Sequence, residues 1–240
     1  MVPHQNPTGM QGFVFNTRRD IFKNPQVREV LGYAFDFEWS NRTLFNGQYT
    51  RTGSFFSNSD QASLGIPKDE ELEILERYRD QLPERIFTNE FILPTTDGTG
   101  RPRSNLRVAG RLLEKTGWKT RDLKLVNNET GEPLKFEILL YSPAFERIVL
   151  PFISNLEQLG IDASIRLVDQ TQYINRLRAK DFDMVVYTWG QSDTPGNEQR
   201  GYWGTNAADQ NGSRNLAGIK DPIIDELIEL LVLSDSREEL

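Results

Sequence analysis

Apolar residues recur at helical spacing near the start of the chain. Gly12–Phe15 is a short apolar run that predicts a buried strand. Asn24 and Pro25 then signal a helix start, because asparagine caps free backbone N–H groups and proline fits the first helical position. A second short helix is expected from Glu38 to Phe45. The first of these helices has one apolar face, made of Val27, Val30, Leu31, Ala34 and Phe35.

Longer polar segments separate the helices in the middle of the chain. Residues 46–67 are rich in Gly, Ser, Asn and Thr and predict a long loop, and such loops in compact domains often carry function. Lys68–Leu82 has a Glu- and Arg-rich helical pattern typical of a surface helix. Ser104 is expected to cap a further helix, which ends at Gly117.

Strands and helices alternate from residue 136 onward. Phe136–Leu140 is a predicted strand, and Pro143 begins a long helix that Gly160 ends. Residues 161–167 alternate between apolar and polar side chains, which predicts a strand with one solvent-exposed face.

A further helix and strand complete this unit. Gln170–Lys180 predicts a helix, and Met184–Thr188 is a continuous apolar run typical of a central strand buried on both faces. Strands joined by short helical connections imply right-handed crossovers in a largely parallel sheet flanked by helices. The fold class is therefore α/β, and Asp221 and Pro222 begin a final helix. The inner face of the 170–180 helix is expected to consist of Tyr173, Ile174 and Leu177.

Composition restricts the possible functions. The 240 residues carry a formal net charge of −7, with no basic stripe, which argues against nucleic acid as a partner. The chain has no cysteine and one histidine, His4, which argues against a Ser-His-Asp triad or a histidine-rich metal centre. No cofactor or metal is expected. No apolar run approaches the roughly 18 residues of a membrane-spanning helix.

The segment after the Met184–Thr188 strand combines side chains suited to a ligand site. Ligands of open α/β sheets bind beyond the carboxyl ends of the strands, where residues 189–203 begin. The segment supplies aromatic faces, glycines that allow close backbone approach, and polar groups that can orient a ligand. Glu198 and Arg200 are expected to position this loop. The predicted ligand-binding residues are Tyr187, Trp189, Gln191, Ser192, Asp193 and Asn197.

Simpler interpretations exist for parts of this set. Trp189 and Trp203 would also suit a hydrophobic core, and Asp193–Pro195 would suit an ordinary turn. Tyr49 and Arg51 are further candidates for a cleft wall, although a solvent-exposed loop explains their surroundings more simply.

Five stretches of the chain resemble bacterial family 5 solute-binding proteins, the peptide- and nickel-binding subunits of ABC importers. Phe13-Val-Phe-Asn-Thr-Arg-Arg and the segment 27–36 are similar to an element near the start of this family's second lobe. Trp189-Gly-Gln-Ser, Ser192–Arg200 and Ser213–Lys220 resemble the YejA-type oligopeptide branch.

The resemblance implies a type II periplasmic-binding-protein lobe that closes with another lobe around a peptide-like ligand. Such a protein works in the periplasm and presents its ligand to an inner-membrane permease. Residues 1–240 would be the second, inserted lobe, with the first lobe absent and the return to it truncated. The sequence agrees with an excerpt, because it starts without a signal peptide and Ser236–Leu240 begins a helix of only one turn.

The resemblance also implies a role for an aspartate. Peptide-binding relatives carry an aspartate shortly after the tryptophan at this strand end, where it pairs with the peptide's α-amino group. Counting from Trp189, that place falls on Ser192, with Asp193 one position later. Either Asp193 takes the role through a shifted loop, or the ligand is bound without this salt bridge.

Two other functions remain open from the sequence. An α/β hydrolase or transferase would use Asp193 and Glu198 for acid–base chemistry, which requires the two carboxyl groups to converge on one pocket with perturbed pKa values. A sensor or adaptor domain would reuse the binding-protein fold without serving import.

Overall fold

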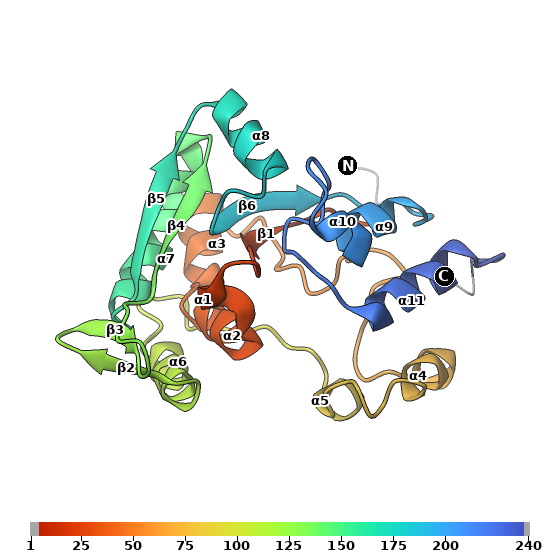
Figure 1. Cartoon of the computed structure of the whole chain (residues 1–240), viewed down its shortest axis with the longest axis horizontal. Helices are drawn as coiled ribbons and strands as arrows, with labels where there is room; N and C mark the ends of the chain where they lie inside the picture. The colour runs from red at the N-terminus through yellow and green to blue at the C-terminus, as the bar shows by residue number, and fades with distance from the viewer. Residues whose placement is uncertain (1–4, 238–240) are drawn as a thin grey trace.

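The computed structural model describes residues 5–237, so His4 and residues 238–240 lie outside the described part. A four-stranded sheet, in the order β1-β6-β4-β5, forms the centre of the molecule (Figure 1). Its strands are β1 (Met10–Phe15), β4 (Lys135–Leu140), β5 (Asp162–Leu167) and β6 (Met184–Trp189). β4 is parallel to both β5 and β6, whereas β1 pairs with β6 in the antiparallel direction. The predicted α/β fold with a largely parallel sheet is confirmed.

The remaining elements surround this sheet. A hairpin consists of β2 (Trp118–Arg121) and β3 (Lys124–Asn127), and a short 3-10 helix, η1 (Pro143–Phe145), precedes α7. The helices are α1 (Asp20–Lys23), α2 (Pro25–Tyr33), α3 (Phe37–Phe45), α4 (Asp69–Glu76), α5 (Arg85–Thr88), α6 (Arg103–Lys115), α7 (Glu146–Glu157), α8 (Gln170–Arg178), α9 (Glu198–Trp203), α10 (Thr205–Ala208) and α11 (Pro222–Val232).

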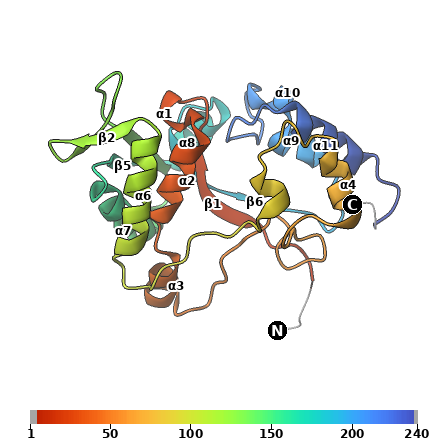
Figure 2. The same cartoon turned by 90° about the horizontal axis from the view of Figure 1, so that it is seen from below.

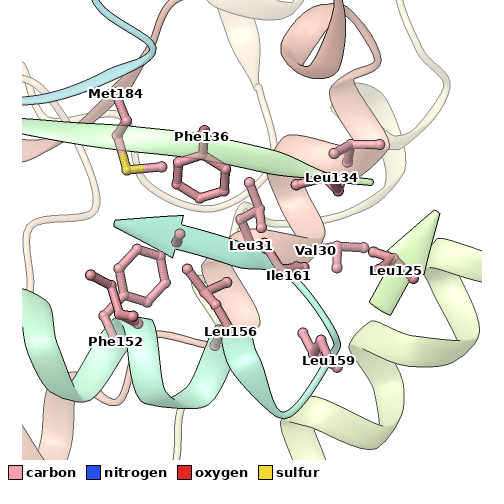
Figure 3. Packing of buried hydrophobic residues seen from close by; sticks show 14 of the residues in the cluster. Val30, Leu31, Leu125, Leu134, Phe136, Phe152, Leu156, Leu159, Ile161 and Met184 are labelled. Atoms are coloured by element: carbon pink, nitrogen blue, oxygen red, sulfur yellow. The ribbon is translucent and has the colours of Figure 1, made fainter. Parts of the chain in front are cut away.

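Hydrophobic residues pack on both faces of the sheet because successive strand residues point to opposite faces. Ile138 and Met184 face the larger core, which α2, α6 and α7 cover, and neighbouring Leu139 and Val185 face a second core against α8 and α9. Figure 3 shows the larger core, where Phe136, Leu156 and other apolar side chains meet. Figure 2 shows α2, α6 and α7 on one side of β1 and β6, with α9, α10 and α11 on the other.

Two helix starts follow the sequence signals closely. The Asn24 side chain accepts a hydrogen bond from the backbone of Gln26, and Pro25 is the first residue of α2. The Asp221 side chain likewise accepts from Ile223 at the start of α11.

Some predicted details are wrong. Ser104 does not cap α6, because the helix already begins at Arg103 and the backbone N–H of Leu106 bonds to the carbonyl of Pro102. The predicted helix at 68–82 ends at Glu76 and continues as turns. Ile174 does not face inward but is 38% exposed.

β6 is not buried on both faces along its whole length. Its register with β4 covers only the pairs Ile138–Met184 and Leu139–Val185, so its later residues have β1 as their only neighbouring strand. Thr188, in this part of the strand, is exposed, and its hydroxyl accepts a hydrogen bond from Gln11. The end of β6 therefore projects past the parallel part of the sheet and presents the segment that follows it.

The turn after β1 holds the 208–218 segment in place. The backbone N–H and side-chain hydroxyl of Thr17 both donate to the carbonyl of Ala217. The Arg18 guanidinium donates to the carbonyls of Ala208, Asn215 and Leu216. Thr17, Arg18 and residues 215–217 belong to stretches that carry the family resemblance, and here they hold two distant segments of the fold together.

The ammonium group of Lys180 gives stability a predicted dependence on pH. Burial, and secondarily the charge of Arg18, lower the pKa of Lys180 from 10.5 to about 8. Between these two values the unfolded chain binds more protons than the folded chain, so stability is expected to rise as pH increases from about 8 towards about 10. Burial raises the pKa of Tyr173, so its deprotonation in the unfolded chain reverses the trend above about pH 10.

Urea unfolding near pH 7.5 and 9.5 of the original chain and of Lys180→Met checks this prediction. The rise in unfolding free energy with pH should be smaller in the variant. Lys68→Met removes an exposed lysine and serves as the control. An equal rise in Lys180→Met and the original chain would contradict the prediction.

Candidate ligand-binding site

Aromatic rings gather at the carboxyl end of β6. The ring centroids of Trp189 and Trp203 lie 5.1 Å apart, and Tyr187 lies 5.1 Å from Trp189. Phe55, from the long 46–67 loop, completes the group at 4.5 Å from Trp203 and 6.0 Å from Trp189. These rings form part of the second core and connect β6, α9 and the long loop.

Trp189 is a core residue in this structure. Only 6% of it is exposed, and its indole N–H donates to the carbonyl of Arg214 at 3.3 Å. The core interpretation of Trp189 therefore describes its present contacts, and direct ligand contact stays a prediction. Tyr187 is half-buried, and burial raises the pKa of its hydroxyl.

Ser192 and Asp193 lie on the exposed part of the 190–197 loop. The Ser192 hydroxyl accepts a hydrogen bond from the backbone of Thr194 at 3.1 Å, which shapes the bend. The Asp193 carboxylate accepts from both terminal nitrogens of Arg237, at 3.2 and 3.1 Å. Arg237 also contacts both carboxylate oxygens of Asp60, at 3.2 and 2.8 Å.

This Asp60–Arg237–Asp193 cluster joins three segments that lie far apart in the sequence. Its hydrogen bonds raise the pKa of Arg237 above the ordinary arginine value, the bonds to Asp60 contributing most. The Arg237 side chain is 43% exposed and that of Asp193 is 52% exposed. Because both partners are largely exposed, this ion pair is screened by solvent and the Asp193 carboxylate remains accessible to another cation.

Glu198 and Arg200 both make contacts that hold the loop and α9. The Glu198 carboxylate accepts from the backbone N–H of Gly196 at 2.9 Å and from Gln199 at 3.2 Å. Arg200 forms a two-point ion pair with Glu229 on α11, at 2.7 and 2.5 Å. Arg200 also donates to exposed Asn197, so this side of the loop is tied to α9 and α11.

Tyr49 and Arg51 make their contacts beside α3, not within the aromatic group. The Tyr49 ring packs against Phe45 at 4.8 Å and is 58% exposed. The Arg51 guanidinium donates to the carbonyl of Pro94 and lies 5.6 Å from the Phe37 ring. Burial lowers the pKa of Arg51 although the charge of Glu38 opposes the shift. Their role in a cleft stays a prediction.

The geometry does not favour acid–base chemistry by Asp193 and Glu198. Asp193 faces Arg237, whereas Glu198 is occupied by Gly196 and Gln199. Burial tends to raise the pKa of Glu198, but hydrogen bonds from backbone N–H groups and from Gln199 bring the net pKa below its ordinary value. A lowered pKa is the opposite of what a general acid requires at neutral pH.

Within residues 5–237, no group of three or more acidic, histidine or cysteine side chains is arranged to hold a metal ion. In the same part of the chain, no helix is both long and apolar enough to cross a membrane.

Sequence reasoning missed several residues that shape this site. Asp60 belongs to the long loop that was expected to have a function, but the pattern of that loop did not single it out. Arg237 is distant in the sequence and meets Asp193 only in the folded chain. A polar loop rich in serine and asparagine gives no periodic signal that could have identified these contacts.

The chain has the fold of a lobe of type II periplasmic binding proteins. The oligopeptide-binding protein AppA from Bacillus subtilis, solved with a nonapeptide, matches with a TM-score of 0.69 at 19% identity, over 98% of this chain and 41% of that chain. A periplasmic oligopeptide-binding protein from Thermotoga maritima with bound mannohexaose matches with a TM-score of 0.68 at 15% identity, over 100% of this chain and 41% of that one.

Sequence similarity then defines the family. The chain belongs to the bacterial extracellular solute-binding proteins, family 5, whose middle region matches residues 2–211. A probable peptide-binding protein YejA from Agrobacterium fabrum is 46% identical over 96% of this chain and 38% of its own length. The chain thus spans less than two-fifths of that relative. The predicted family is confirmed, and it is a family of binding proteins, so the enzyme alternative is wrong.

Proposed function

We propose that this chain is the second, inserted lobe of a periplasmic protein that captures peptide-like ligands for an ABC importer. The observation that carries the proposal is the exposed Asp193 carboxylate on the loop after β6, within a family 5 solute-binding fold. The Agrobacterium relative is named as a probable peptide-binding protein, and the Bacillus structure holds a nonapeptide, which supports a peptide as the ligand.

Asp193 is suited to receive the α-amino group of a peptide. Its carboxylate already binds a cationic nitrogen group from Arg237 through both oxygens. A ligand ammonium would form the same kind of charge-assisted hydrogen bond, which is stronger in a closed cleft than in open solvent. The shifted position of the aspartate relative to Trp189 is compatible with this role because the loop extends its side chain away from the core.

Capture requires more protein than this chain contains. Closure of a second lobe over the 190–197 loop would bury the ligand and complete its contacts. An inner-membrane permease would then receive the ligand. Alone, the 240-residue chain is expected to bind peptides weakly or not at all, because half of the cleft is missing.

Titration calorimetry on the full-length protein tests the proposal. Trialanine and its N-acetyl derivative are the probes, and mannohexaose tests the saccharide alternative. We expect Asp193→Asn to weaken trialanine binding at least about tenfold, which is about 1.4 kcal/mol, and to leave the weaker binding of the acetylated peptide unchanged. Asp122→Asn, at the exposed hairpin tip, is the control.

Other outcomes would contradict specific parts of the proposal. Binding of mannohexaose but not of peptides would refute the peptide ligand. Equal trialanine affinity in Asp193→Asn and the original protein would remove Asp193 from amine recognition. Tight binding by the 240-residue chain alone would refute the two-lobe site. A deletion strain that still accumulates labelled trialanine normally would favour the sensor or adaptor alternative over import.

A further inference from the structure

Four side chains are linked by directed hydrogen bonds beside the aromatic group. The indole N–H of Trp203 donates to Gln199 Oε1 at 2.9 Å. Gln199 Nε2 then donates to Gln191 Oε1 at 2.6 Å and also to Glu198 Oε1 at 3.2 Å. Gln199 is only 3% exposed, so these bonds lie mostly away from solvent.

The donor and acceptor chemistry of the side chains fixes the direction of these hydrogen bonds. An indole N–H can only donate and an ionised carboxylate can only accept, so Gln199 must turn its oxygen to Trp203 and its nitrogen to Glu198. The same nitrogen reaches Gln191, which must therefore present its oxygen to Gln199. Flipping the Gln199 amide would break its bonds to Trp203 and Glu198, and flipping the Gln191 amide would break its bond to Gln199.

These bonds leave the side-chain nitrogen of Gln191 in a fixed orientation and without a hydrogen-bond acceptor in the described part of the chain. This nitrogen, Nε2, is also buried. Most buried polar atoms in folded proteins have a partner, and leaving one unpaired costs free energy. Since Gln191 follows directly after Gly190 at the end of β6, this unpaired donor lies in the segment where a ligand is expected.

We propose that Gln191 Nε2 is a preoriented donor for a carbonyl oxygen of the bound ligand, with Gln199 and Trp203 as positioning residues. This inference rests on the proposed function and assigns one polar contact within it. A neutral amide carbonyl fits better than a carboxylate, because the Glu198 carboxylate shares Gln199 with Gln191 and would repel a second anion. The ligand class is therefore a molecule with amide groups, such as a peptide.

The ligand reaches this donor when the 54–63 loop shifts. Phe55 of this loop packs over Trp189 and Trp203, next to the hydrogen-bonded amides. Both amide atoms of Gln61, in the same loop, are likewise buried without a partner in the described part of the chain. The present loop position thus leaves Gln61 as well as Gln191 with unpaired polar atoms, and a ligand amide that enters beside Gln191 would supply the partner that its Nε2 lacks.

Gln191→Met in the full-length protein separates a ligand role from a structural one. The methionine removes the unpaired donor but also removes the acceptor of the Gln199 Nε2 bond, while Gln199 keeps its bonds to Trp203 and Glu198. One unpaired buried donor replaces another, so the melting temperature is expected to stay within about 2 °C of the original protein. Trialanine affinity, measured by titration calorimetry, is expected to fall at least about tenfold.

Two further variants sharpen the test. Gln191→Glu still accepts from Gln199 but replaces the donor by an acceptor, so it should weaken trialanine binding at least as much. Gln172→Met, on the exposed surface of α8, should change neither quantity. Unchanged affinity in Gln191→Met would overturn the inference and leave the proposed function intact. A melting temperature lowered by several degrees would make Gln191 a structural residue, and a full-length protein that binds no peptide would overturn the proposed function together with the inference.

Discussion

Replacing Asn215 by alanine is expected to lower the free energy of unfolding of the chain by roughly 3–5 kcal/mol. Asn215 is fully buried, and its side chain makes four hydrogen bonds to backbone groups. Its nitrogen donates to the carbonyls of Gly204 and Ile219, at 3.0 and 2.9 Å. Its oxygen accepts from the backbone of Gly218 and Ile219, at 2.9 Å each. Alanine would leave these buried groups without partners.

Urea unfolding, with the midpoint and slope fitted for each variant, measures this loss. Asn215→Asp keeps the acceptor and loses the two donations, so it should also be destabilising. Asn206→Ala, an exposed position near Gly204, should change the unfolding free energy by less than about 0.5 kcal/mol. A loss below about 1 kcal/mol in Asn215→Ala would mean that water replaces the side chain and that the 204–220 segment does not depend on it.

Trp189→Ala is expected to cost about 3–5 kcal/mol of stability, through loss of a large buried side chain. The Trp189 ring contacts Phe55, Tyr187 and Trp203, and its replacement would open a cavity between the long loop, β6 and α9. Trp189→Phe keeps most of these apolar contacts and should cost much less. Urea unfolding gives the stability change, and near-ultraviolet circular dichroism reports on the aromatic group.

The same variants distinguish a core role of Trp189 from direct contact with the ligand. If the side chain acts as core, peptide affinity of the full-length protein should recover in Trp189→Phe along with stability. Tyr49→Ala, at an exposed aromatic residue, is the control and should change stability by less than about 0.5 kcal/mol. A Trp189→Ala variant as stable as the original chain would show that the ring is not part of the core.

The stretches that resemble family 5 proteins serve different purposes. Thr17 and Arg18 hold the carbonyl groups of the 208–218 segment, and Asn215 within that segment organises its turns. Asn215 bonds to Gly204 at the end of α9, and Arg214 of the same segment accepts from Trp189 at the end of β6, so this segment positions both elements. By contrast, Ser192 and Asp193 lie on an exposed loop where a change of ligand would require few changes of the fold.

Local sequence patterns anticipated most of the architecture. The apolar alternation in residues 161–167 and the continuous run at 184–188 correspond to β5 and β6, and the Asn24-Pro25 signal marks the start of α2. The β2–β3 hairpin was not predicted. Its turn places Asp122 and Leu123 at positive φ without a glycine, so the usual turn signal is absent from the sequence.

Periodicity and local residue patterns are enough to assign the α/β class and the family, and they predict the segment after β6 as the place for a ligand. These conclusions depend on periodicity and on neighbouring residues, which a linear pattern contains. Three features became visible only in the folded chain: the buried position of Trp189, the link from Asp193 through Arg237 to Asp60, and the unpaired donor of Gln191. The physical reason is that hydrogen bonds and ion pairs depend on distances of about 3 Å between groups far apart in the chain, and only folding sets those distances.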